Sequence, residues 1–155
     1  MPIRILFLED EAGYQEYVSS DLRELGFAVD DCFRIDQAKE LFEESKDDID
    51  CVVVDLNMDD RWLGEYKNES FGGFFSGAVW LEHFVFKSKP NIPTIIFSGY
   101  CDLLKREKPY LCNKQNVRCV NKGIGENSGF EGLLKALEDL LGFDGLMEVL
   151  ENRPY

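Results

Sequence analysis

Polar residues that could bind a metal ion or contact a phosphoryl group stand at the ends of several apolar runs of this 155-residue chain. Glu9 and Asp10 follow one run, Asp55 another, and Ser98 and Lys122 end two more. Carboxylates brought close together repel one another, so they need a cation or raised pKa values. Two carboxylates, a carbonyl and waters suit a hard divalent cation such as Mg²⁺. With Lys122 and Ser98, such a site has the charges needed to transfer a phosphoryl group to Asp55.

The elements that must position these residues can be read from the apolar patterns. Runs rich in β-branched and aromatic residues predict five strands, at 3–8, 27–32, 51–56, 93–98 and 117–120. Helical spacing predicts helices at 11–25, 36–42, about 77–87, 101–108 and 128–141. Asp36 is predicted to cap the second helix, and Pro109 to end the fourth. Ser128 and Glu131 have the spacing of a capping box.

Strands that alternate with helices are typical of an α/β fold with a doubly wound parallel sheet. In such sheets ligands gather at the carboxyl ends of the strands, where the polar residues lie. Without a repeat or linker, residues 1–155 are expected to form a single domain. The stretch at about 59–76 is expected to be an irregular insertion, and about 143–155 a short C-terminal extension. Leu146, Val149 and Leu150 suggest a further helical turn there.

The formal net charge of −13 is unevenly distributed. Residues 1–60 contain 18 Asp and Glu against 5 Lys and Arg, whereas residues 61–155 contain 12 of each. This balance disfavours nucleic acid as a partner, since phosphates require Lys and Arg. No apolar run is long enough to cross a membrane, and the N-terminus has no signal-peptide pattern. We therefore expect a cytoplasmic protein.

The five cysteines favour reduced, mostly buried thiols over a zinc site or a disulfide framework. Their number is odd, no pair has C-x-x-C spacing, and His83 is the only histidine. The cysteines are Cys32, Cys51, Cys101, Cys112 and Cys119.

The polar strand ends resemble those of the receiver domains of two-component response regulators. The matching segments are 8–11, 54–58, 97–100 and 121–122, and the resemblance spans about residues 2–141. It implies a flavodoxin-like five-stranded parallel sheet in the order 2-1-3-4-5, with helices on both faces.

The same resemblance implies a role for each polar residue. Asp55 would accept the phosphoryl group, Ser98 would turn its hydroxyl toward that group, and Lys122 would pair with it. The residues that would hold Mg²⁺ are Glu9, Asp10, Asp55 and, through its backbone carbonyl, Asn57. The donor would be a histidine kinase or a phosphotransfer protein, and a stand-alone receiver would signal by protein–protein contact. It would be a signalling phosphoacceptor rather than an enzyme in the usual sense.

The chain departs from the receiver pattern in three places. Residues 59–76 lengthen the loop after Asp55, Gly123 replaces the usual proline after Lys122, and Cys119 replaces the usual aromatic residue. One alternative is therefore a degenerate receiver that binds partners through 59–76 without phosphorylation. Another is a phosphate-ester hydrolase, although Asn57 stands where such enzymes commonly carry a second aspartate.

Overall fold

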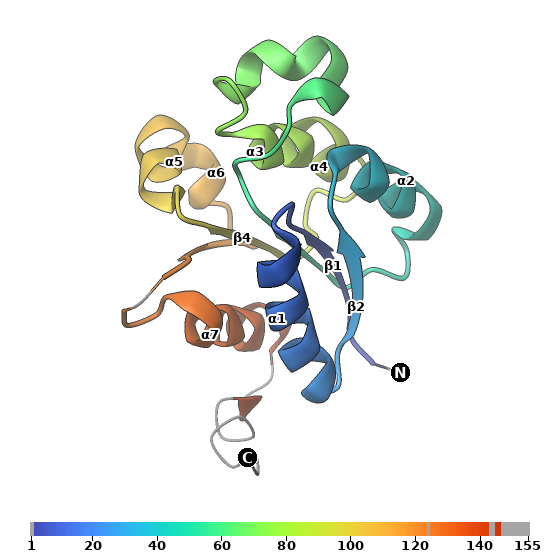
Figure 1. Ribbon diagram of the computed structural model, residues 1–155, viewed down its shortest axis with the longest axis vertical. Helices are drawn as coiled ribbons and strands as arrows, with labels where there is room; N and C mark the ends of the chain where they lie inside the picture. The colour runs from blue at the N-terminus through green and yellow to red at the C-terminus, as the bar shows by residue number, and fades with distance from the viewer. Residues whose placement is uncertain (1, 124, 143–144, 147–155) are drawn as a thin grey trace.

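Five parallel strands form one sheet in the order β2-β1-β3-β4-β5 (Figure 1). This computed structural model describes residues 2–123, 125–142 and 145–146. The strands are β1 (Arg4–Leu8), β2 (Ala28–Cys32), β3 (Cys51–Val54), β4 (Thr94–Ser98) and β5 (Val117–Asn121). The predicted flavodoxin-like sheet and its strand order are confirmed.

Helical segments connect all of these strands and cover both faces of the sheet. They are α1 (Ala12–Glu24), α2 (Ile35–Ser45), a 3₁₀ helix η1 (Arg61–Ser70), α3 (Ser76–Trp80), a π-helical turn η2 (Leu81–Val85), α4 (Phe86–Ser88), α5 (Cys101–Glu107), α6 (Pro109–Cys112) and α7 (Gly129–Leu141). Segments α3, η2 and α4 follow one another without a break and together form the single helix predicted at about 77–87.

The core lies in two layers because successive strand residues point to opposite faces of the sheet. On one face, Phe7 of β1 packs in a buried cluster with Leu22 of α1 and Leu137 of α7. On the other face, Leu6 lies in a cluster with Phe42 of α2 and Trp80 of α3. The central strand β3 is buried along its whole length, as its run of β-branched residues predicts. This covered sheet fixes where the polar strand ends lie.

Two helix boundaries differ from the sequence prediction. Asp36 is the second residue of α2 rather than its cap; its carboxylate pairs with Arg34 at 2.9 Å. The Gln37 side chain instead accepts the backbone N–H groups of Phe33 and Arg34. Pro109 does follow the end of α5, but it also begins α6, because the first helical position needs no N–H donor.

The capping box predicted for Ser128 and Glu131 is not formed. The Ser128 side chain makes no cap hydrogen bond, and Gly129, the first residue of α7, has a left-handed φ of 61°. The Ser128 backbone carbonyl still accepts the first hydrogen bond of the helix, from the Gly132 N–H at 3.0 Å. Glu131 faces Lys135 at 3.6 Å instead. At the other end of α7, Gly142 is the predicted stop, in a left-handed conformation.

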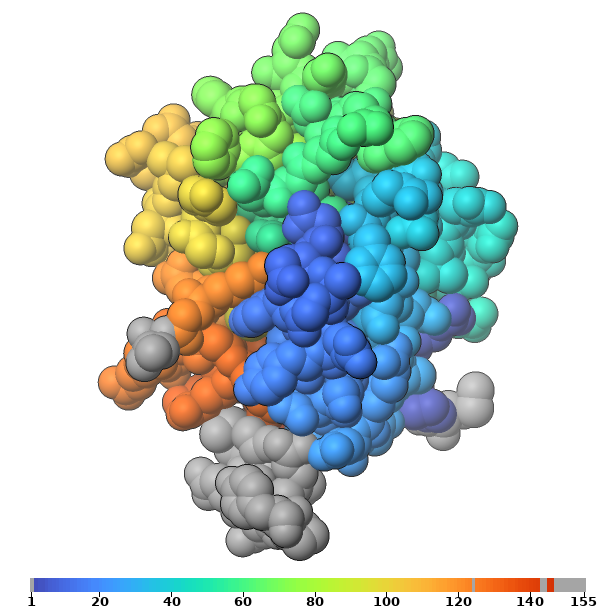
Figure 2. All heavy atoms as spheres, in the orientation of Figure 1, coloured from blue at the N-terminus to red at the C-terminus, as the bar shows by residue number. Residues whose placement is uncertain are grey.

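The stretch 59–76 is more regular than predicted, because η1 occupies most of it. Gly64, with φ 60° and ψ −126°, kinks this helix, and Phe71 ends it in a left-handed conformation. The space-filling view shows that these green residues form one end of the molecule (Figure 2).

No helix among the described residues is long and apolar enough to cross a membrane. The further helical turn predicted around Val149 and Leu150 lies outside the described residues, as does most of the predicted extension at 143–155.

Candidate functional site

The register of the parallel strands brings the polar strand ends to one edge of the sheet. Leu8 pairs with Val54 across β1 and β3, so the residues that follow each of them are neighbours. The Asp55 N–H donates to the Leu8 carbonyl at 3.0 Å, which extends the pairing by one residue. Glu9 and Asp55 therefore leave the sheet side by side.

Three carboxylates cluster at this edge. Oxygens of Glu9, Asp10 and Asp55 all lie within 4.8 Å of one another. Glu9 and Asp55 are only 1% and 8% exposed, whereas Asp10 is exposed. The cluster thus has two buried carboxylates and one that faces solvent, all with the oxygen ligands that Mg²⁺ prefers.

Lys122 lies against the two buried carboxylates. Its Nζ donates to Glu9 Oε2 at 2.6 Å and to Asp55 Oδ2 at 3.0 Å. The ring of Tyr14, in the first turn of α1, lies 4.7 Å from the same amine. The Lys122 N–H donates to the Ser98 carbonyl at 3.2 Å, which positions the lysine directly after β5. One ammonium therefore pairs with two of the three carboxylates, and the cluster keeps an excess of negative charge.

The pKa values follow from this crowding. Burial, and then the charge of Asp55, raise the pKa of Glu9 to about 7, although Lys122 opposes the shift. Burial and Asp55 also raise the pKa of Asp10. Burial lowers the pKa of Lys122, but Asp55 and Glu9 raise it, and the net shift is upward. The edge is thus a site at which further positive charge is electrostatically favoured.

The backbone around Asp55 is closely packed. Asp55 Oδ1 accepts the N–H of Leu56 at 2.7 Å, which fixes one side of the carboxylate. Gly77, near the start of α3, lies directly behind: a Cβ at this position would be 1.9 Å from the Asp55 carbonyl oxygen. A glycine is therefore required there so that α3 can pack against the loop that carries Asp55.

Ser98 and Asn57, the other predicted site residues, lie near the carboxylate cluster in the sequence or the sheet, and within the described part of the chain neither forms a hydrogen bond to its carboxylates. Ser98 is buried at the end of β4 and pairs with Asn121, next to Lys122. Its Oγ accepts the Tyr100 N–H at 3.2 Å. Asn57 is exposed two residues after Asp55. Their roles, as hydroxyl and as carbonyl ligand, remain predictions.

A pocket of about 230 Å³ beside Asp10 was not predicted from the sequence. Its lining residues come from the loop after β1, the start of α2 and the chain around the beginning of the inserted stretch. They are Asp10, Phe33, Arg34, Ile35, Met58, Asp59, Arg61 and Trp62. Two arginines and two aromatic side chains thus stand next to the acidic cluster. Only the closeness of the inserted stretch to Asp55 in the sequence pointed toward this arrangement.

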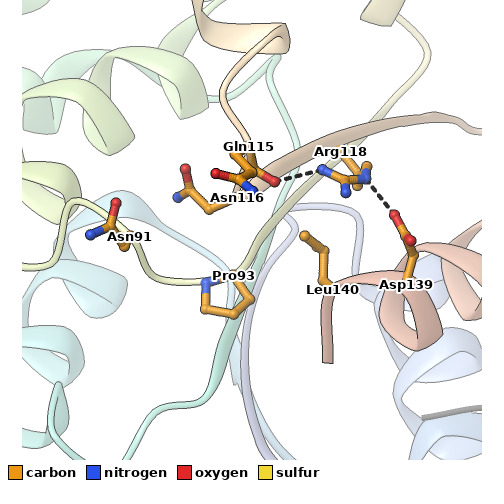
Figure 3. A pocket seen from close by; sticks show the side chains of 7 residues that line it. All are labelled: Asn91, Pro93, Gln115, Asn116, Arg118, Asp139 and Leu140. Atoms are coloured by element: carbon orange, nitrogen blue, oxygen red, sulfur yellow. Dashed lines mark hydrogen bonds and ion pairs between the residues drawn. The ribbon is translucent and has the colours of Figure 1, made fainter. Parts of the chain in front are cut away.

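Another pocket, of about 370 Å³, lies at the opposite edge of the sheet (Figure 3). It is lined by Asn91, Pro93, Gln115, Asn116, Arg118, Asp139 and Leu140. Pro93 and Asn116 directly precede β4 and β5, so the pocket is at the amino ends of these strands. Arg118 lies toward Asp139, at 2.7 Å, and also donates to the Gln115 carbonyl. Its charge is therefore already paired, and none of the carboxylate cluster lies there.

Comparison with solved structures places this architecture among known folds. A response regulator receiver domain protein from Clostridium thermocellum superposes with a TM-score of 0.67 at 20% identity, covering 96% of this chain and 98% of that one. The non-phosphorylated HemR receiver domain from Leptospira biflexa gives 0.67 and 20%, covering 99% and 98%. The chain has the receiver fold. No protein-family model and no curated protein matches the sequence.

A third similar receiver structure is the chemotaxis response regulator CheY4 of Vibrio cholerae, with a TM-score of 0.66 at 16% identity, covering 90% of this chain and 99% of that one. The structure shows what each of the three departures from the receiver sequence pattern looks like. Residues 59–76 build η1 and one wall of the 230 Å³ pocket. The peptide bond between Lys122 and Gly123 is trans. Cys119 lies half-buried on β5 beside Cys112.

Proposed function

We propose that this receiver accepts a phosphoryl group on Asp55 and signals through protein–protein contact. The surroundings of Asp55 carry the proposal. One carboxylate oxygen is 3.0 Å from the Lys122 amine, the other accepts the Leu56 N–H, and two further carboxylates lie within 4.8 Å. A nearly buried carboxylate at a polar sheet edge, next to a lysine, suits a phosphoryl acceptor.

We further propose that Glu9, Asp10 and Asp55 hold Mg²⁺, together with the backbone carbonyl of Asn57. Three carboxylates against a single ammonium fit a divalent cation in both charge and ligand type. When bound, Mg²⁺ supplies positive charge to the oxygens of the transferring phosphoryl group. Because Asp10 is exposed, the cluster is open to solvent on one side.

The residues of this chain would then divide the reaction between them. An Asp55 oxygen attacks phosphorus as the bond to the donor histidine nitrogen of a histidine kinase or phosphotransfer protein breaks. Lys122 exchanges part of its pairing with Asp55 for a phosphoryl oxygen, while Glu9 keeps the ammonium in place at 2.6 Å. The Ser98 hydroxyl exchanges its contact with the Tyr100 N–H for another phosphoryl oxygen.

A small phosphodonor tests this directly. We expect the wild-type protein, incubated with acetyl phosphate and Mg²⁺, to gain the mass of one labile phosphoryl group. The gain should be absent from Asp55→Ala and present in the control Asp59→Ala, because Asp59 pairs with Arg61 in the next segment. Absence of the gain in the wild type, or its persistence in Asp55→Ala, would contradict the proposal.

A second candidate function is supported by the surface of the inserted stretch. Trp62, Phe71 and Phe74 are 38%, 61% and 43% exposed, and Phe74 packs edge-on against Tyr100 at 5.3 Å. Exposed aromatic side chains are typical of a surface that binds another protein, and one of these, Trp62, lines the 230 Å³ pocket. A degenerate receiver would use this surface whether or not Asp55 is phosphorylated.

Mg²⁺ titration separates the two functions. A phosphoacceptor is expected to bind Mg²⁺ in calorimetry, whereas a module that relies on 59–76 needs no such binding. Trp62 shares the 230 Å³ pocket with Asp10, while the only other tryptophan, Trp80, is fully buried. We therefore expect Mg²⁺ to change the fluorescence of the wild type and leave that of Trp62→Phe unchanged. No calorimetric signal would favour the second function.

A further inference from the structure

Three of the five cysteines converge beside β5, on the face covered by α5 and α6. Cys101 is the first residue of α5, Cys112 the last residue of α6, and Cys119 the middle residue of β5. Figure 1 shows α5 and α6 next to each other at this side of the sheet. All three side chains belong to, or pack against, the buried cluster that includes Leu104 and Leu111. The fold therefore brings together three thiols that are far apart in the sequence.

The Cys112 and Cys119 sulfurs are already in contact. The Cys119 thiol donates to Cys112 Sγ across 3.2 Å. A disulfide bond is about 2.0 Å long, so a small side-chain movement is enough to bring the sulfurs together. Cys101 is differently engaged: its thiol donates to the backbone carbonyls of Val120 at 3.3 Å and Ile96 at 3.6 Å. Cys119 also interacts with Cys101, but the Cys101 side chain is fully buried and its thiol is held by backbone carbonyls, which leaves Cys112 as the accessible partner of Cys119.

Exposure separates the same pair from the remaining thiols. Cys112 and Cys119 are half-buried, whereas Cys32, Cys51 and Cys101 are 3% exposed or less. A dissolved oxidant therefore reaches this pair first. The alternative, that the thiols serve only as small core side chains, suits the three buried cysteines best; it gives no special role to the accessible sulfur–sulfur contact of the half-buried pair.

We propose that Cys112 and Cys119 are a modification site, at which a peroxide forms a reversible disulfide. The Cys112 thiolate attacks a peroxide oxygen; the O–O bond breaks, and the hydroxide released takes up a proton to become water. The sulfur of Cys119 then attacks the resulting sulfenic acid, loses its proton, and displaces a second water. Two thiols lose two electrons and two protons, and hydrogen peroxide is reduced to two waters.

The surroundings set the order of these steps. A hydrogen bond with Cys101, and then burial, raise the pKa of Cys119, while the same bond lowers the pKa of the fully buried Cys101, so Cys119 remains a proton donor. Burial also raises the pKa of Cys112, but the hydrogen bond from Cys119 and the charge of Lys105 oppose that shift. Because Cys112 Sγ also accepts the hydrogen bond of the Cys119 thiol, we assign Cys112 as the first nucleophile. Since its thiolate is a minor species, we expect the reaction to be slower than at a cysteine of low pKa.

The bond would join α6 to β5 at a position close to the acidic edge. Cys119 pairs with Ile96 in β4, two residues before Ser98, and it is three residues before Lys122. The consequence for signalling rests on the proposed function: a covalent link here would hold the α5–α6–β5 surface in one arrangement. The formation of the disulfide itself is independent of phosphorylation.

Thiol counting with peptide mapping tests the site. The reduced protein, treated with hydrogen peroxide and then denatured with N-ethylmaleimide, should lose two of its five alkylatable thiols. Mapping should recover one linked pair, Cys112 with Cys119, and dithiothreitol should restore all five thiols. Retention of all five, or a linked pair that contains Cys101, would overturn the proposal.

Single variants check the assignment. We expect Cys112→Ser to abolish the linked pair, and Cys119→Ser to leave a sulfenic acid on Cys112 that dimedone traps. Cys32→Ala is the matched control, because Cys32 is buried on β2, and it should form the disulfide as the wild type does. An equal loss of thiols in Cys112→Ser would count against the site. Because mapping uses no phosphodonor, its failure is distinguishable from failure of the Asp55 proposal.

Discussion

The acidic edge and the inserted stretch 59–76 are neighbours that are held in place by different means. At the edge, Glu9, Asp55 and Lys122 each directly follow a strand, and the backbone register of a buried sheet sets their separation. The inserted stretch is one continuous segment that packs on α3 and contacts η2 through side chains. The pairing of the strands therefore fixes the geometry of the acidic edge, whereas side-chain contacts fix the geometry of the inserted stretch.

The contacts that hold the inserted stretch are specific. The Tyr66 ring stacks on His83 of η2 at 3.7 Å, with an angle of 8° between the ring planes. His83 Nε2 also lies 2.8 Å from Glu69 Oε1. Near the end of the stretch, the buried Ser76 hydroxyl donates to the Met58 carbonyl at 2.8 Å. Loss of any one of these contacts should loosen the stretch while leaving the sheet edge intact.

The largest effect is expected from Gly77→Ala, at the junction of the two regions. The new Cβ would meet the Asp55 carbonyl oxygen at 1.9 Å, and a backbone atom has no rotamer by which to move away. We expect a loss of about 3 kcal/mol in the free energy of unfolding, measured with urea. Gly99→Ala is the control, because a Cβ there meets no atom within 4 Å. Equal stability of the two variants would show that α3 can move away from Asp55 without cost.

Lys122→Ala should act next most strongly, and on phosphorylation rather than on the inserted stretch. The substitution removes the ammonium from Glu9 and Asp55 and from the phosphoryl oxygens. We expect phosphorylation by acetyl phosphate to slow about 10- to 100-fold, as for the loss of one charged hydrogen bond. Lys135→Ala, on the exposed face of α7, should keep the wild-type rate. A wild-type rate in Lys122→Ala would remove the lysine from the site.

Tyr66→Ala is expected to loosen the inserted stretch alone. It removes the stacked contact with His83, worth about 1 kcal/mol beyond the buried area. Hydrogen exchange of the η1 amides should become faster, while the amides of β1 and β3 keep their protection. Tyr17→Ala, an exposed position on α1, is the matched control. Faster exchange in β1 and β3 as well would show that the two regions open together.

Trp62→Ala should have the smallest effect. Its side chain is 38% exposed and lines the pocket beside Asp10, so little buried packing is lost with it. We expect a change of less than about 0.5 kcal/mol in stability, and phosphorylation by acetyl phosphate at the wild-type rate. A slowing comparable to that of Lys122→Ala would make the inserted stretch part of the reaction site and end the distinction between the two regions.

The sequence predicted the acidic edge well because strand ends are easy to place. Apolar β-branched runs mark where Leu8 and Val54 lie, and parallel pairing then brings Glu9 and Asp55 together. The predicted grouping of Glu9, Asp10, Asp55 and Lys122 is observed; the chemical role of each residue stays a prediction.

Features that depend on side-chain packing were beyond the sequence. The stretch 59–76 was expected to be irregular because it is rich in Gly, aromatic and polar residues, whereas the structure forms η1 there, stabilised by the Tyr66–His83 stack. The Ser128 capping box failed because a left-handed Gly129 redirects the chain, and φ values cannot be read from residue types. The contact between Cys112 and Cys119 appears only once α6 packs on β5.

Locating the phosphorylated residue tests the central claim most directly. After incubation with acetyl phosphate and Mg²⁺, borohydride reduces an aspartyl phosphate to homoserine, which peptide sequencing by mass spectrometry can locate. We predict homoserine at position 55, only when both phosphodonor and Mg²⁺ are present. Homoserine at Asp10 or Asp59 instead, or at no position under these conditions, would contradict the assignment of Asp55 as the phosphoacceptor.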